Sequence, residues 1–173
     1  MKNKLVPDYC FHTFDAITPE FLLSIGIRGV LLDVDNTLEP YENPKPTEKV
    51  LTWLSSLREN GIKAAIVSNN GKDRIEAFNE ELGLPYYYKA KKPFKKNLIS
   101  AMADIGTDVD NTMFIGDQIL TDVWAARNAK IRAALVPPIK DKTDAFTRFK
   151  RWLEKPILKK YKKIHDCEEV FKK

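Results

Sequence analysis

Continuous apolar segments alternate with amphipathic segments along this chain, and this order restricts the fold more than any other feature. The apolar segments cover 29–33, 64–68 and 112–116, with shorter ones at 86–88 and 133–136. Uninterrupted apolar strands are typical of sheets that are covered on both faces. We therefore predict an α/β fold, a Rossmann-like three-layer sandwich with a mostly parallel sheet.

The amphipathic segments carry the patterns of helices. Apolar residues recur at helical spacing in 47–60, 72–82 and 95–105, and a glycine ends or follows each segment, as expected at helix C-termini. The predicted buried stripe of the last segment consists of Leu98, Ile99, Met102 and Ile105.

Two further helices are indicated by their first residues. Thr18 is a predicted N-cap and is followed by Pro19, which suits the first helical position. Thr121 is a second predicted N-cap, with Asp122 in the first turn of a helix that reaches about Asn128.

The bulk composition predicts a single domain over residues 1–173. A hydrophobic content of 43% beside 31% charged residues is ordinary for a soluble globular protein. We find neither a signal peptide nor an apolar run long enough to cross a bilayer, so a cytoplasmic location is expected. Cys10 and Cys167 match no zinc or disulfide pattern and are expected to be ordinary reduced thiols.

The net charge of +5 is concentrated at the C-terminus. From Lys140 onward twelve bases face six acids, and the rest of the chain is close to neutral. Such basic clusters attract nucleic acid, anionic lipid or phosphorylated substrates, although a merely solvated face has the same composition. A second cluster consists of Lys89, Lys91, Lys92, Lys95 and Lys96.

Polar residues follow three of the predicted strands at the point where each strand ends. The sequence reads DVDNTL at 33–38, SNNG at 68–71 and GDQILTD at 116–122. Functional groups of open parallel sheets gather beyond the carboxyl ends of the strands. These three segments are therefore predicted to form one site.

These residues are suited to the hydrolysis of a phosphate monoester. Asp33 is placed to be the nucleophile, and Asp35 to protonate the leaving group and then activate water. Carboxylate and phosphate repel, so a divalent cation must bridge them. Mg²⁺ would be held by Asp33, Asp117 and the main-chain carbonyl of Asp35. Ser68 would donate a hydrogen bond to the phosphoryl group, and a lysine would neutralise its remaining charge.

The segment from about 30 to 136 resembles the haloacid dehalogenase superfamily. The DxDxT pattern beginning at Asp33, a match at Ser68, a lysine and a GD…D run beginning at Gly116 follow one another in the family's order. The lysine is best matched by Lys92, with Lys91 and Lys95 as alternatives. This resemblance implies a magnesium-dependent phosphatase that forms an aspartyl-phosphate.

The residues next to these motifs have structural interpretations, and two of them also have functional ones. Asp122 is either a metal ligand or outer-sphere residue, or a favourable charge at a helix N-terminus. Asn69 is a predicted phosphate contact that would also suit the turn, whereas Asn70 is expected only to make the turn. Glu39 and Tyr41 are expected to shape the loop after Asp33.

The intervals between the motifs leave no room for a large cap domain. Between Asp35 and Ser68 the chain supplies a loop, a helix and a strand, and between Ser68 and Lys92 one helix and one short strand. An open site suits a phosphate carried by protein, nucleic acid or a membrane lipid.

The capless layout resembles subfamily IIIA, in particular its phosphatidylglycerophosphate phosphatases. This implies a lipid-linked phosphate monoester and peripheral contact with an anionic membrane, at the inner membrane surface. Nucleic acid ends or phosphoproteins are alternative substrates, and an RNA- or ribosome-associated binding module without catalysis is the alternative of another class. The C-terminal segment fits either anionic partner, because basic residues surround Phe146, Phe149, Trp152 and Leu153.

Overall fold

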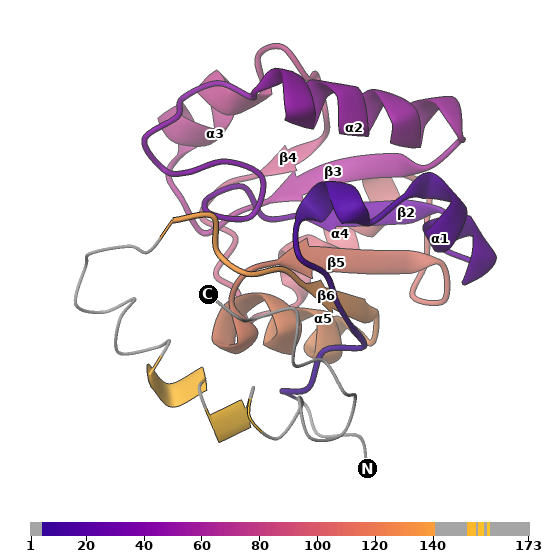
Figure 1. Ribbon diagram of the computed structural model, residues 1–173, viewed down its shortest axis with the longest axis vertical. Helices are drawn as coiled ribbons and strands as arrows, with labels where there is room; N and C mark the ends of the chain where they lie inside the picture. The colour runs from indigo at the N-terminus through magenta and orange to yellow at the C-terminus, as the bar shows by residue number, and fades with distance from the viewer. Residues whose placement is uncertain (1–4, 141–151, 155, 158, 160–173) are drawn as a thin grey trace.

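The computed structural model describes residues 5–140, 152–154, 156, 157 and 159, and these form a single six-stranded sheet with flanking helices (Figure 1). All neighbouring strands are parallel, in the order β1-β6-β5-β2-β3-β4. The strands are β1 (Tyr9–Cys10), β2 (Gly29–Leu32), β3 (Lys63–Val67), β4 (Tyr86–Tyr87), β5 (Thr112–Gly116) and β6 (Arg132–Leu135).

Helices cover both faces of the sheet, as predicted. Leu32 belongs to the core on one face and Leu31 to the core on the other, because successive strand residues point in opposite directions. The first core is closed by α1 (Pro19–Ser24), α2 (Glu48–Glu59), α3 (Lys72–Asn79) and the 3₁₀ turn η1 (Phe14–Ala16); the second is closed by α4 (Lys96–Asp104) and α5 (Trp124–Ala129). The three-layer α/β sandwich is confirmed.

Most predicted elements are present with small shifts at their ends. Thr18 is the N-cap of α1, and its hydroxyl accepts a hydrogen bond of 3.2 Å from the Phe21 amide. Gly61, after α2, has the positive φ of +72° that favours glycine there. Strand β1, which has only two residues, was not predicted.

Two predictions about helices are wrong. Thr121 does not begin a helix: a π-helical turn, η2 (Ile119–Val123), precedes α5 and contains both Thr121 and Asp122. The reason is local, since the Asp122 side chain folds back to accept a hydrogen bond from the Gln118 amide. Ile99 is 47% exposed and does not belong to the buried stripe of α4, because only one side of this short helix faces the sheet.

No large cap domain is present in the part of the chain that the structure describes. Helix α2 and strand β3 occupy the interval between Asp35 and Ser68, and α3 and β4 occupy the next one. None of the described helices is long and apolar enough to cross a membrane. Of the predicted basic C-terminal segment, Trp152 and Leu153 are exposed, whereas Phe146 and Phe149 lie outside the described residues.

Candidate active site

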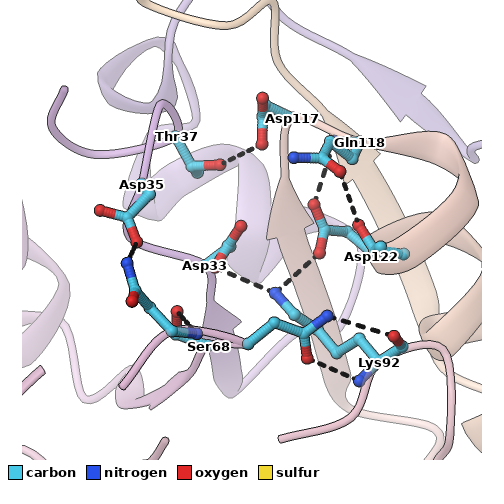
Figure 2. Close-up of polar contacts among 11 residues, drawn as sticks. Asp33, Asp35, Thr37, Ser68, Lys92, Asp117, Gln118 and Asp122 are labelled. Carbon is cyan, nitrogen blue, oxygen red and sulfur yellow. Dashed lines mark hydrogen bonds and ion pairs between the residues drawn. The ribbon is translucent and has the colours of Figure 1, made fainter. Parts of the chain in front are cut away.

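Three strands end together and bring the predicted site residues to one edge of the sheet (Figure 2). In the ladder, Leu32 at the end of β2 pairs with Ile66 of β3 and Ile115 of β5. The residues that follow these strands therefore meet, and the Asp33 amide donates a 3.0 Å hydrogen bond to the Ile115 carbonyl. The prediction that the three motifs converge is confirmed.

Lys92 is the lysine that reaches the centre of this site. Its side chain is 1% exposed, and its ammonium group lies 2.9 Å from Oδ1 of Asp33 and 2.7 Å from Oδ1 of Asp122. Burial alone would lower the pKa of Lys92, but the carboxylates of Asp122 and Asp33 outweigh it and raise the pKa above its ordinary value. Lys91 and Lys95 are exposed.

Asp122 is committed to holding Lys92 in place. Oδ1 faces the lysine, and Oδ2 accepts a 3.0 Å hydrogen bond from the Gln118 amide. The Asp122 side chain is 1% exposed, and this burial raises the pKa of Asp122 although the facing Lys92 lowers it. A Cβ at Gly116 would lie 2.5 Å from Oδ2 of Asp122, so glycine is required there for the carboxylate to fit.

The amide of Asn69 fixes the loop that carries Lys92. Its Oδ1 accepts a 2.7 Å hydrogen bond from the Lys92 amide, and its Nδ2 donates one of 3.1 Å to the Lys92 carbonyl. These two bonds use one of the two Nδ2 hydrogens of Asn69, and its contact with phosphate stays a prediction. Ser68 is 1% exposed, and its Oγ accepts a 3.2 Å hydrogen bond from the Asn70 amide, which leaves its own hydroxyl proton to donate.

The carboxylate of Asp35 lies on the side of Asp33 away from Lys92 (Figure 2). Its Oδ2 accepts a 2.8 Å hydrogen bond from Nδ2 of Asn70, and Oδ1 lies 3.2 Å from both Nε and Nη2 of Arg74. Asn70 also makes the expected turn, since its Oδ1 accepts from the Gly71 amide. The contact between Arg74 and Asp35 was not predicted from the sequence. A basic residue in α3 was visible in the sequence, but no spacing rule connects it with Asp35.

Glu39 shapes the loop after the first strand, as expected. Its buried carboxylate accepts hydrogen bonds from Nδ2 of Asn43 at 2.9 Å and from the Thr47 amide at 3.1 Å, and also from the Thr47 hydroxyl. These contacts tie the loop to the N-terminus of α2. Tyr41, in the same loop, is 51% exposed.

The acidic residues of the site suit a hard divalent cation. One carboxylate oxygen from each of Asp33, Asp117 and Asp122 lies within 4.8 Å of the others. Both oxygens of Asp122 have partners, Lys92 and the Gln118 amide, whereas Lys92 contacts only Oδ1 of Asp33, so Asp33 and Asp117 are the better candidate ligands. Oδ1 of Asp117 also accepts a 3.4 Å hydrogen bond from Thr37. Carboxylate oxygens are the ligands that Mg²⁺ prefers, so this donor set fits the predicted metal.

Comparisons with known proteins agree with this geometry. Residues 26–136 match the haloacid dehalogenase-like hydrolases. The chain is 36% identical over 163 residues to a Bacillus subtilis protein named "Probable phosphatase YqeG", covering 94% of this chain and 95% of that one. It is 28% identical over 96 residues to the phosphoglycolate phosphatase of Agrobacterium fabrum, covering 50% of this chain and 41% of that one.

A solved structure shows the same fold. The cobalt-bound deoxy-D-mannose-octulosonate 8-phosphate phosphatase of Haemophilus influenzae superposes with a TM-score of 0.53 at 15% identity. The match covers 84% of this chain and 96% of that one.

Proposed function

Because the chain belongs to the haloacid dehalogenase-like hydrolases and is a phosphoric monoester hydrolase, we propose that it works through an aspartyl-phosphate on Asp33. The observation that carries this proposal is the placement of Lys92 between Asp33 and Asp122. The buried ammonium group lies 2.9 Å from Oδ1 of Asp33, which leaves the second oxygen of this carboxylate for attack. The same cation would offset charge on a transferring phosphoryl group.

In the first step of the proposed reaction, an oxygen of Asp33 forms a bond to phosphorus while the bond from phosphorus to the leaving oxygen breaks. Asp35 gives that oxygen its proton, and the alcohol departs. In the second step Asp35 takes a proton from water as the water oxygen bonds to phosphorus. The acyl-phosphate P–O bond then breaks, which releases inorganic phosphate and restores the Asp33 carboxylate.

Mg²⁺ would be held by Asp33, Asp117 and the main-chain carbonyl of Asp35. When bound it would neutralise the negative charges of nucleophile and phosphate, which otherwise repel. Ser68 would donate its hydroxyl proton to a phosphoryl oxygen. Asn69 would hold the lysine loop through its bonds to the Lys92 main chain, and the second hydrogen of its Nδ2 would donate to a phosphoryl oxygen.

For the substrate we propose a lipid-linked phosphate monoester, such as a phosphatidylglycerophosphate-like headgroup at an anionic membrane. The absence of a cap in the described residues supports a large substrate, and the rim of the site offers suitable chemistry. Phe94 is 70% exposed between the exposed Lys91 and Lys95, close to the lysine that contacts Asp33. Each basic residue at an anionic surface contributes about 1 kcal/mol, screened by salt.

Turnover of a phosphatidylglycerophosphate in anionic vesicles, compared with 5′-phosphorylated RNA and a phosphopeptide at equal phosphate concentration, tests this substrate. We expect the lipid to be hydrolysed fastest, and Phe94→Ala to slow that reaction but not hydrolysis of nitrophenyl phosphate. Ile99→Ala removes another exposed apolar side chain and is the matched control. Faster turnover of the RNA or the peptide would reject the lipid and leave the chemistry at Asp33 intact.

A further inference from the structure

We propose that Arg74 is a positioning residue for Asp35, and that it acts with Asn70 to fix the orientation of the Asp35 carboxylate during turnover. The inference rests on the proposed function, in which Asp35 exchanges protons with the leaving group and with water. It is carried by two sets of contacts: those that hold the carboxylate, and those that hold Arg74 itself.

Both oxygens of the Asp35 carboxylate have partners. Asn70 donates to Oδ2 at 2.8 Å, and Arg74 approaches Oδ1 with Nε and Nη2, each at 3.2 Å. The carboxylate is almost buried, at 8% exposure, so water competes little with these donors. Rotation about the Cβ–Cγ bond would break contacts at both oxygens together.

Besides its contact with Asp35, Arg74 is itself held at two points. Its Nη1 donates a 3.1 Å hydrogen bond to the Pro44 carbonyl, in the loop that follows Asp35. Its guanidinium carbon lies 5.4 Å from the centroid of the buried Phe78 ring. The side chain is only 10% exposed. It therefore connects α3 to two points of the 35–44 loop, so the orientation of Asp35 is set by a rigid helix.

A guanidinium suits this task better than an ammonium group. Its planar fork presents several donors in fixed directions, so it can bind Asp35 and Pro44 at once, whereas a lysine offers one compact point of charge. Proton transfer requires the carboxylate to come within about 2.6–3.2 Å of the reacting oxygen. A displacement of about 1 Å can cost roughly 100-fold in rate. Loss of Arg74 should therefore act on proton transfer through Asp35.

The test measures kcat and KM of Arg74→Ala on an alkyl phosphate and on nitrophenyl phosphate. An alkoxide needs a proton to leave and a nitrophenolate hardly does. We therefore expect kcat to fall about 10- to 100-fold for the alkyl phosphate and clearly less for the aryl phosphate, with KM little changed. Lys72→Ala is the control, because Lys72 is an exposed cation of the same helix that pairs with Glu76. It should leave both reactions unchanged.

A double-mutant cycle with Asp35→Asn shows whether Arg74 acts through Asp35. We expect the doubly substituted protein to lose no more activity than Asp35→Asn alone, because the same function is removed once. If Arg74→Ala does not fold, two other variants test the same proposal. Asn70→Ala removes the donor to Oδ2 of Asp35, and Arg74→Lys keeps a positive charge at position 74 but removes the planar fork.

Several outcomes overturn the inference. Equal losses for the two substrates, or losses that multiply with those of Asp35→Asn, would make Arg74 a general structural residue. A raised KM at unchanged kcat would make it a substrate-binding residue. If Asp35→Asn itself shows no dependence on the leaving group, the proposed role of Asp35 fails and the inference fails with it. A dependence in Asp35→Asn without one in Arg74→Ala rejects the inference alone.

Discussion

Lys92 is held between two carboxylates where water barely reaches. Lys92→Met should therefore leave Asp33 and Asp122 facing each other without a cation. Breaking a buried pair in this way costs about 3–5 kcal/mol. Loss of a charge-stabilising donor lowers kcat by about 100- to 1,000-fold. Urea unfolding and steady-state kinetics measure the two effects.

The substitution Asp122→Asn, added to Lys92→Met, separates stability from chemistry. It removes one of the two facing charges, so the free energy of unfolding should partly recover while activity stays low. Recovery of activity in the doubly substituted protein would contradict a role for the lysine charge in phosphoryl transfer.

The pair Asp33 and Asp117 predicts a requirement for Mg²⁺. Removal of divalent cations with a chelator should abolish turnover, and added Mg²⁺ should restore it. Ca²⁺ should inhibit, because its larger and more flexible coordination shell suits an in-line displacement poorly. Asp117→Ala should raise the Mg²⁺ concentration needed for half-maximal rate and lower the rate itself, whereas the exposed Asp110→Ala should not. Full activity in the presence of chelator would exclude the metal.

At the residue scale, the sequence predicted the residues that follow the strands and meet at the site. It did not predict the hydrogen-bond partners of their side chains. Asp33, Ser68 and Asp117 follow apolar strands, so their convergence followed from the strand order alone. Arg74 and Asn70 contact Asp35 across loops whose conformation is set by long-range packing. Their partners could not be read from spacing, and neither could the hydrogen bonds between Asn69 and the main chain of Lys92.

At the scale of the elements, the turn between β5 and α5 requires a glycine at position 116. In Gly116→Ala the new Cβ would lie 2.6 Å from Cβ of Asp122, too close for two carbon atoms. Overpacking of this kind costs about 1–3 kcal/mol. We expect a lower midpoint of thermal unfolding and a lower kcat, since Asp122 would no longer hold Lys92 in place.

Gly71→Ala, at the start of α3, is the control for Gly116→Ala. A Cβ there meets nothing within 4 Å and the φ of −71° is ordinary, so stability should be unchanged. Wild-type stability and activity in Gly116→Ala would show that the turn relaxes easily and that the position of Asp122 does not matter.

The same turn shows where sequence patterns fail for whole elements. Thr121 followed by Asp122 has the composition of a helix start, yet both residues lie inside the π-helical turn Ile119–Val123. The residue types indicate only a local preference for a helix start. The conformation of the turn is set by the ion pair of Asp122 with Lys92 and by its hydrogen bond from the Gln118 amide. The long strands and α2, α3 and α4 were predictable because their apolar patterns extend over several residues.

On the scale of the whole molecule, Glu154 connects the C-terminal part of the chain with the turn that carries Asp122. The buried Glu154 carboxylate accepts a 2.9 Å hydrogen bond from the Leu120 amide, between Asp117 and Asp122. Glu154→Ala removes this acceptor and should cost about 1–3 kcal/mol of stability, with a smaller loss of kcat. The exposed Glu80→Ala is the control. Unchanged thermal unfolding in Glu154→Ala would mean that this contact does not support the turn.

The central claim is that hydrolysis passes through a phosphate bonded to Asp33. The most direct measurement mixes the enzyme with labelled substrate and Mg²⁺, quenches it in acid within one turnover, and locates the label by peptide mass spectrometry. We expect the label on Asp33, in an amount that rises and falls with the course of the reaction, and neither label nor turnover in Asp33→Asn. A single turnover that releases phosphate without labelling Asp33, or appreciable hydrolysis by pure Asp33→Asn, would contradict the account.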